Sequence, residues 1–202
     1  YGMWGDEKRA GIDMMIGSNL DEIRYFVPTE GGEEGFLDTL RWIAKRDRAL
    51  LNDQEKAMYD EFMATLADES EGSRLEQYCN DINFRAGNTN MAIRHSAAGG
   101  STYMYFIRKP VTTPQLGAIH AAEIPYLFDT CIPDPMGSGE IVGTDECEFR
   151  HVAKEMWTNF ARTGNPSTDK SEWKKFSGDD RQAMVFDDTI GMQKDIFGRR
   201  ED

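Results

Sequence analysis

The chain has 202 residues, of which 39% are hydrophobic, 11% aromatic and 29% charged. This balance is typical of a globular protein rather than a disordered one, and the length permits one sizeable domain with a buried core. The 36 acidic and 23 basic residues give a net charge of -13, which would repel phosphate backbones and anionic lipid surfaces. We therefore expect no nucleic-acid partner and no membrane partner.

Cysteine spacing and the start of the chain bear on its cellular context. Cys79, Cys131 and Cys147 form no CxxC pair, which argues against a disulfide framework and a thiolate zinc site. A reducing cytoplasm fits this count better than secretion, and a secreted form with one bridge and one free thiol stays open. No apolar run approaches the roughly 20 residues that span a bilayer, and the first residues lack a signal-peptide pattern. Because the chain starts at Tyr1 rather than at Met, we expect it to be a piece of a longer polypeptide.

The first predicted strand leads into an acidic loop. Residues 12–16 form a short apolar run between two glycines, which predicts a buried strand, and the loop GSNLDE follows at residues 17–22. Asp21 and Glu22 thus lie just past the carboxyl end of a strand, where functional residues collect in open α/β sheets. A solvated loop, or the first turn of a helix, is the alternative interpretation of this acidic pair.

Three helical segments are predicted next. Apolar residues recur at helical spacing over residues 36–44, over residues 58–66 after a start signal at Asn52 and Asp53, and over residues 75–82. Gly87 and Asn88 are expected to bend the third helix, which continues to His95 and ends at two glycines. The apolar stripes favour packing against a sheet over a substrate groove. We expect His95 to be structural.

A second strand and loop repeat the arrangement of the first. Residues 101–108 are rich in aromatic and β-branched side chains, which predicts a strand, and the stretch GAIHAAEIPYLF follows at residues 117–128. Gly117 permits a positive φ and Pro125 disfavours helical geometry at Ile124, so His120 is predicted on a shaped loop. The loops of Glu22 and His120 would meet if their strands are neighbours.

The remaining chain supplies one clear helix and weaker signals. Residues 130–143 carry prolines and glycines and predict a loop or lid-like excursion. A helix is predicted from Thr144 until Gly164 and Pro166 end it. Residues 183–186 predict a short strand, and the charged end GRRED is expected to be frayed.

A carboxylate and a histidine on successive loops suit the orienting acid and the base of a nucleophilic triad. The stretches GSNLDE and GAIHAAEIPYLF, with WTNFARTGNPS at residues 157–167, together resemble the type-B carboxylesterases, a family that includes para-nitrobenzyl-esterase-like enzymes and cholinesterases. The resemblance implies an α/β fold in which residues 1–202 form the C-terminal part of a single α/β-hydrolase domain. It implies a cofactor-free carboxylic ester hydrolase, with Glu22 as acid, His120 as base, Glu123 as a supporting group behind the histidine and a structural role for residues 157–167.

The sequence departs from this family in lacking a GxSxG nucleophile elbow. Neither Ser18 nor Ser138 has the required spacing. We therefore expect the serine, the oxyanion hole and most of the sheet to come from an N-terminal segment of the same hydrolase, so that the chain alone is inactive. A catalytically inactive, hydrolase-like binding module is the alternative.

A metal site is a further alternative, since Glu148 with His151 and His120 with Glu123 have metal-ligand spacing. The helix that carries Glu148 and His151 argues against such a site. Its core-facing side is an apolar stripe, whereas metal ligands would have to face the core. We expect no metal.

Overall fold

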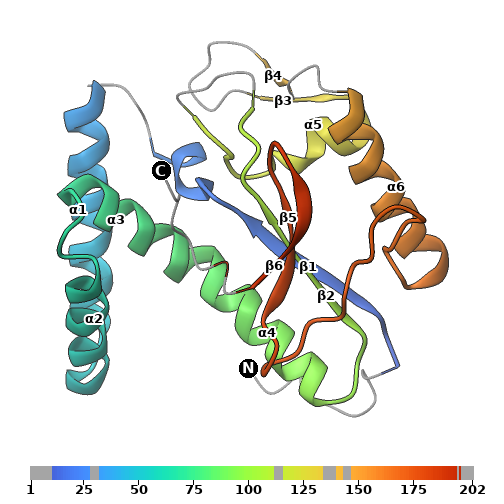
Figure 1. The fold of residues 1–202 in the computed structure, drawn as a ribbon. Coiled ribbons are helices and arrows are strands. Elements are labelled where there is room, and N and C mark those ends of the chain that lie inside the picture. The colour runs from blue at the N-terminus through green and yellow to red at the C-terminus, as the bar shows by residue number, and fades with distance from the viewer. Residues whose placement is uncertain are drawn as a thin grey trace.

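A four-stranded mixed sheet lies at the centre of the computed structural model, in the order β1-β2-β5-β6 (Figure 1). The structure describes residues 11–27, 32–111, 116–133, 140–142, 147–194 and 196. Strand β1 (Met14–Asn19) runs parallel to β2 (Thr102–Ile107), which runs parallel to β5 (Gln182–Phe186). Strand β6 (Ile190–Lys194) pairs with β5 in antiparallel fashion. The fold is α/β, as predicted.

Two strand predictions need correction. The first strand covers Met14–Asn19 rather than residues 12–16, so it runs through Gly17, Ser18 and Asn19, which the sequence suggested as a turn. Gly17 permits this because a Cβ there would lie 2.3 Å from the Tyr105 carbonyl oxygen on β2. Strand β6 was not predicted, because Ile190–Lys194 is short and lacks an alternation of apolar and polar residues.

Two helices cover opposite faces of β2. Tyr103 and Tyr105 point to one face, where their rings lie 6.0 Å from Phe160 and 5.2 Å from Trp157 of α6 (Cys147–Thr163). Thr102 points to the opposite face of the strand, where its Oγ1 atom lies 2.7 Å from Nδ1 of His95 in α4 (Ala86–Ala97). His95 is buried there, in agreement with a structural role. Every residue of β5 is buried between these layers.

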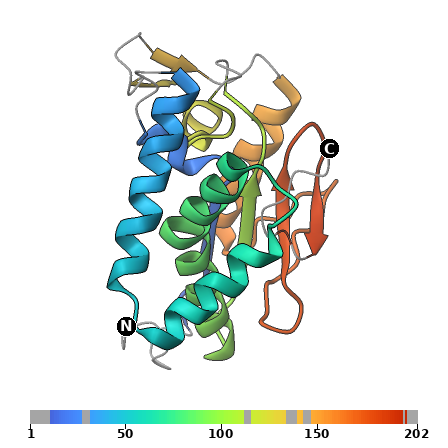
Figure 2. The same cartoon turned by 90° about the vertical axis from the view of Figure 1, so that its left-hand side faces the viewer.

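The three helices between β1 and α4 form a second apolar cluster beside the sheet (Figures 1 and 2). They are α1 (Gly32–Leu50), α2 (Asp53–Thr65) and α3 (Glu71–Asn80), and they confirm the predicted helical segments. Asn52 caps α2 in a capping box with Glu55. Buried residues of α1 and α3 form most of the cluster, namely Leu40, Ala44, Leu75, Tyr78 and Cys79.

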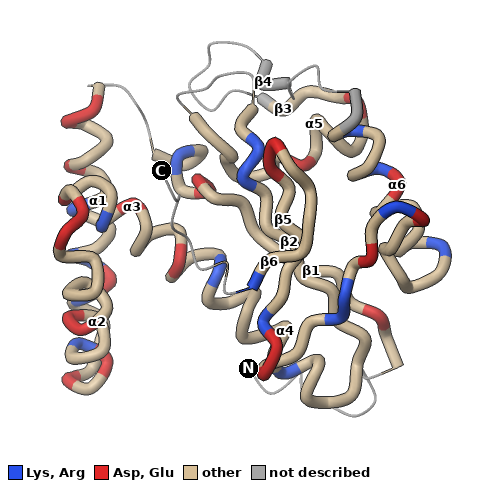
Figure 3. Tube along the Cα trace, viewed as in Figure 1, with Lys and Arg blue, Asp and Glu red and all other residues tan. Residues whose placement is uncertain are grey.

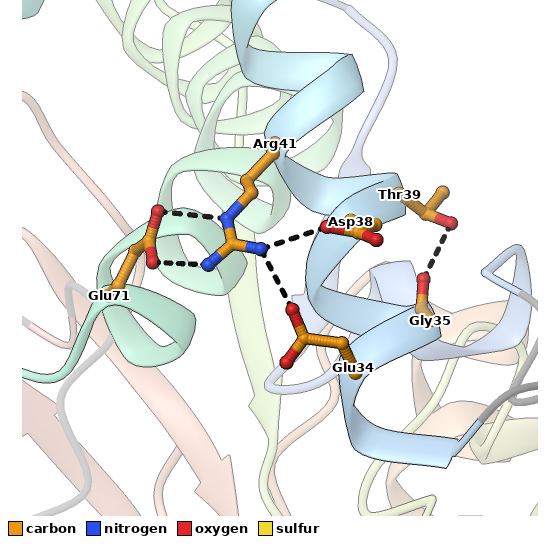
Figure 4. Close-up of polar contacts among 6 residues, drawn as sticks. All are labelled: Glu34, Gly35, Asp38, Thr39, Arg41 and Glu71. Atoms are coloured by element: carbon orange, nitrogen blue, oxygen red, sulfur yellow. Dashed lines mark hydrogen bonds and ion pairs between the residues drawn. The ribbon is translucent and has the colours of Figure 1, made fainter.

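Polar contacts on the surface accompany this cluster. Arg41 of α1 donates two hydrogen bonds to Glu71 at the start of α3, at 3.0 and 2.7 Å, and contacts Asp38 and Glu34 at 2.8 and 3.1 Å (Figure 4). Exposed ion pairs contribute little net stability, so the apolar cluster holds these helices together. Figure 3 shows that charged residues of both signs are spread over α1 to α3, whereas the strands carry few.

The helical irregularity that the sequence placed at Gly87 and Asn88 lies earlier in the chain, as a π-helical segment. A five-residue π-helical segment, η3 (Asp81–Arg85), joins α3 to α4, and Gly87 lies in regular helix. Ile82, predicted on the apolar face, is 51% exposed as a result, since the wider turn rotates it outward. Phe84, which contacts the site described below, belongs to this turn.

The segment after His120 differs from its prediction at two points. Pro125 lies within helix α5 (Glu123–Phe128), so Ile124 is helical after all; a proline in the first turn is tolerated because amide groups there have no helical acceptor. The segment predicted as a loop contains a small antiparallel pair, β3 (Cys131–Pro133) and β4 (Glu140–Val142).

The expected helix start at Thr144 and the charged C-terminus lie outside the described residues. Helix α6 ends at Thr163, and Gly164 follows with a φ of +72°. Within the described ranges, no helix is long and apolar enough to cross a membrane.

Candidate active site

Glu22 lies just beyond the carboxyl end of β1, as the first residue of the short 3-10 helix η2 (Glu22–Tyr25). Its side chain is only 6% exposed. The backbone amide of Asn19 donates a hydrogen bond to Glu22 Oε1 at 2.7 Å. This bond fixes one carboxylate oxygen and leaves the other, Oε2, to face the next loop.

His120 lies on the loop that follows β2 and contacts the acid directly. Its Nδ1 atom is 2.7 Å from Glu22 Oε2, across 98 residues of sequence. The two loops meet because β1 and β2 are neighbouring parallel strands, so both loops leave the same edge of the sheet. The structure therefore brings together the two residues that the sequence analysis singled out.

The charge environment of His120 favours its protonated form. The hydrogen bond that His120 donates to Glu22 raises the pKa of His120, burial of the ring opposes this, and the charges of Glu22 and Glu123 add to the rise. The side chain is 44% exposed, and among the described residues no hydroxyl contacts its second ring nitrogen, Nε2. The imidazole thus has one nitrogen held by a carboxylate and one free to exchange a proton.

Glu123 lies behind the histidine, one turn along the chain in α5. Its Oε2 atom accepts a hydrogen bond from Asn19 Nδ2 at 2.9 Å, and the same nitrogen donates to the Ile119 carbonyl at 2.8 Å. Glu123 therefore reaches the acid loop through Asn19. The sequence analysis named Glu123 but missed Asn19, because an asparagine after a glycine and a serine is typical of a turn.

A tight backbone contact joins the two loops beside the histidine. The Asp21 amide donates to the Ala118 carbonyl at 3.0 Å, and the Ala118 amide donates to Asp21 Oδ2 at 2.8 Å. Gly117 has a φ of +71°, and a Cβ at this position would lie 2.1 Å from Asp21 Oδ2. Asp21, the first acidic residue of the pair, thus holds the two loops together, and Glu22, the second, faces the histidine.

Three aromatic rings surround the imidazole. The ring centroids of Phe26, Phe84 and Tyr25 lie 5.0, 5.4 and 6.1 Å from that of His120. Phe26 is 54% exposed and stacks on Phe84 at 5.9 Å. The sequence analysis missed these residues; the available signal was that Phe26 belongs to no apolar stripe and lies four residues from the acid.

The other candidates lie apart from this site. Ser18 is buried within β1, His151 is exposed on α6, and Ser138 and the side chain of Glu148 lie outside the described residues. In the described part of the chain, no group of three or more His, Cys, Asp or Glu residues could hold a metal ion. What the site offers chemically is an oriented imidazole beside an apolar surface.

Comparisons with known proteins place this geometry in context. Residues 5–200 match the sequence model described as the Carboxylesterase family. The chain is 33% identical to the para-nitrobenzyl esterase of Bacillus subtilis over 96 residues, 46% of this chain and 19% of that protein. It is 30% identical to acetylcholinesterase 1 of Caenorhabditis elegans over 110 residues, 52% of this chain and 17% of that protein.

A solved structure of PNB esterase matches the fold, with a TM-score of 0.59 and 24% identity over 94% of this chain and 38% of that one. The chain thus spans much less than half the length of the relatives it matches. With a four-stranded sheet, flanking helices and a family match over nearly its whole length, this chain belongs to the carboxylesterase family and has part of an α/β-hydrolase fold.

Proposed function

We propose that residues 1–202 are the C-terminal part of a single hydrolase domain that cleaves carboxylic esters through an acyl-enzyme. Glu22 orients His120, His120 acts as the base, and a serine from an N-terminal segment is the nucleophile. The observation that carries the proposal is the 2.7 Å contact between His120 Nδ1 and Glu22 Oε2. Relatives named para-nitrobenzyl esterase and acetylcholinesterase support an ester as the substrate.

The residues present define the proton transfers. Glu22 accepts a hydrogen bond from Nδ1–H, so the neutral ring presents Nε2 as an acceptor. Nε2 takes the serine proton as the serine oxygen bonds to the ester carbonyl carbon, and Glu22 stabilises the imidazolium. The imidazolium then gives that proton to the departing alcohol as the ester C–O bond breaks. His120 next accepts a proton from water, which attacks the acyl-enzyme, and returns it to the serine as the carboxylic acid leaves.

The completing segment is expected to join the sheet at β1. This strand pairs with β2 on one side only, so among the described strands it forms an edge of the sheet. The buried Asn19 Oδ1 atom also finds no hydrogen-bond donor among the described residues. Both features fit a site whose remaining groups come from another segment. The segment would supply the serine and the oxyanion hole.

The aromatic rings indicate an apolar group near the histidine. Phe26 and Phe84 lie within 5.4 Å of the imidazole, centroid to centroid. Because both rings lie beside the atom that exchanges protons, part of the ester would rest against them. We therefore propose esters with an apolar acyl or alcohol group.

The test uses the completed enzyme, defined as this chain joined to or co-expressed with the nucleophile-bearing segment encoded before Tyr1. In the completed enzyme, His120→Ala is expected to lower kcat for a short-chain p-nitrophenyl ester by on the order of 10⁴-fold to 10⁶-fold, because no other group replaces the base. His151→Ala, on the exposed face of α6, is the matched control and should behave like the parent. Activity retained by His120→Ala would remove this residue from the role.

The same work separates the enzyme from an inactive binding module. A GxSxG elbow in the sequence encoded before Tyr1 supports the enzyme. The absence of such an elbow, together with no hydrolysis by the parent protein, would favour the binding module.

A further inference from the structure

One buried amide connects the acid, the base loop and the carboxylate behind the base. Asn19, the last residue of β1, is 2% exposed. Its backbone amide donates to Glu22 Oε1 at 2.7 Å, and its side-chain nitrogen donates to the Ile119 carbonyl at 2.8 Å and to Glu123 Oε2 at 2.9 Å. Through these bonds, Asn19 contacts the proposed acid Glu22 and one residue on each side of the proposed base in sequence, Ile119 and Glu123.

The chemistry of these contacts requires an amide. The Ile119 carbonyl and the Glu123 carboxylate only accept hydrogen bonds, so the NH2 group of Asn19 must face them, and its two protons serve one each. An aspartate would instead place a carboxylate oxygen, which only accepts hydrogen bonds, against the Ile119 carbonyl and the Glu123 carboxylate. An apolar residue would leave the buried Ile119 carbonyl and the half-buried Glu123 carboxylate without their donor. The position therefore needs two donors on one short, rigid side chain.

The other contacts between the loops do not duplicate this role. The Asp21–Ala118 contact joins the loops before the histidine and touches neither Glu22 nor the imidazole. After the histidine, Ala121 has a φ of +64°, so the backbone leaves regular geometry at that point. The two Asn19 bonds bracket His120, one on each side of it in sequence. They are the contacts that fix where the histidine backbone lies relative to Glu22.

We infer that Asn19 is a positioning residue for the reaction: its amide group holds the base loop against the acid loop so that His120 and Glu22 stay in hydrogen-bonding contact. This inference rests on the proposed function. It adds that the alignment of base and acid depends on a residue that touches neither substrate nor the reacting atoms. A displacement of about 1 Å between such groups costs on the order of 10²-fold in rate.

The test compares Asn19→Ala and Asn19→Asp with Asn88→Ala in the completed enzyme. Asn88 is a matched control, because its side-chain nitrogen also donates to a backbone carbonyl, that of Gly17 in the same strand, at 2.6 Å. For both Asn19 variants we expect kcat for a p-nitrophenyl ester to fall on the order of 10²-fold with KM within about twofold. The Asn88 variant should keep its kcat within about threefold.

Two further measurements separate positioning from general loss of structure. In Asn19→Ala, the His120 pKa, followed by NMR, should fall toward that of a free histidine, because contact with Glu22 loosens and no charge is added; in Asn88→Ala it should not move. The double variant Asn19→Asp/Glu123→Gln restores the hydrogen bond between residues 19 and 123 in reversed order, although not the bond to the Ile119 carbonyl, and should recover roughly tenfold of the lost kcat. If Asn19→Ala does not fold, the nearly isosteric Asn19→Asp gives the kcat readout.

Two results would overturn the inference. The first is an Asn19→Ala enzyme with the kcat and the His120 pKa of the Asn88 control or, where that variant does not fold, an Asn19→Asp enzyme with the kcat of that control. The second is a loss of kcat that the double variant does not recover while the His120 pKa stays unchanged. Either result leaves the proposed function standing as long as His120→Ala abolishes hydrolysis, so the two ideas fail separately.

Discussion

Gly117 is the residue at which the base loop closes onto the acid loop. Its φ of +71° lies in the left-handed region, and a Cβ would stand 2.1 Å from Asp21 Oδ2 and 2.7 Å from the carboxylate carbon. An alanine would be strained in its backbone and would push Asp21 away from the Ala118 amide. We expect Gly117→Ala to lower the free energy of unfolding by about 2 to 4 kcal/mol, measured by urea denaturation.

Gly87→Ala is the matched control for that substitution. Gly87 lies in α4, its φ is not positive, and an added Cβ meets nothing within 4 Å. Alanine there should stabilise the protein by about 0.5 to 1 kcal/mol, since glycine loses more backbone entropy in a helix. Equal effects of the two substitutions would show that the Gly117 geometry carries no special cost.

If the proposed function holds, we expect the raised pKa of His120 to set the pH dependence of the completed enzyme. A general base works in its neutral form, so kcat should rise with pH through a His120 pKa that lies above the ordinary value. Glu22→Gln removes the main cause of the raised pKa, so the rise should move to lower pH while kcat falls on the order of 10⁴-fold. Glu123→Gln removes only a distant charge and should shift the pH profile less, in the same direction. A pH profile that Glu22→Gln leaves in place would contradict the assignment of His120 as the titrating group.

At this scale the sequence predicts residues whose position follows from topology. Glu22 and His120 each follow a recognisable strand, and neighbouring parallel strands bring their loops together. Asn19 and Phe84 escape such reasoning for different reasons. Asn19 follows a glycine and a serine, as in a turn, but lies at the end of a strand, and Phe84, which lies beside His120, belongs to a π-helical turn that has no local sequence signal.

At the scale of elements, the junction of α3 and η3 supports the acid loop. Asn80, buried at the end of α3, accepts a hydrogen bond from the Ile23 amide at 2.8 Å through its side-chain oxygen. Ile23 belongs to η2, the short helix that begins with Glu22. Asn19 of β1 therefore binds the Glu22 carboxylate, and the helical junction binds the backbone of the next residue.

Removal of this contact should weaken the whole acid loop. Asn80→Ala leaves a buried amide without an acceptor, so we expect a loss of about 1 to 3 kcal/mol in the free energy of unfolding. Asn83, in the same segment, donates to the Cys79 carbonyl one turn earlier at 2.8 Å and is exposed. Asn83→Ala should therefore change stability by no more than about 0.5 kcal/mol. Urea denaturation of both variants checks the difference, and a cost at Asn83 as large as that at Asn80 would argue against a special role for the junction.

Elements with a strong periodic pattern are predictable, and the errors lie where packing decides. The capping signal at Asn52 fixes the start of α2, and the long apolar stripe identifies α6. The π-helical turn has no local signal of its own. The formation of strand β6 depends on pairing with β5 rather than on its own residues. Its last four residues show no alternation of apolar and polar side chains; they are Gly191, Met192, Gln193 and Lys194.

For the whole molecule, the two edges of the sheet differ in chemistry. Strand β6 ends in exposed Gln193 and Lys194, and polar or charged residues protect an edge against pairing with other chains. Strand β1 begins with Met14, Met15 and Ile16, which are half-buried and carry no charge. The sequence led us to expect most of the sheet from another segment but did not indicate how differently the two edges are built.

This difference predicts how the 202-residue chain behaves by itself. We expect it to associate through β1 in a concentration-dependent way, and more strongly at high salt, because salt screens the repulsion from a net charge of -13. Sedimentation velocity at several concentrations measures this directly. Addition of the completing segment should replace the oligomers by a one-to-one complex, since the segment occupies the same edge.

Met14→Lys should reduce association of the chain alone, because a charge at an edge strand opposes pairing, whereas Met58→Lys, at an exposed position of α2, should leave it unchanged. A chain that stays monomeric at every concentration and unfolds cooperatively would mean that this edge of the sheet needs no partner.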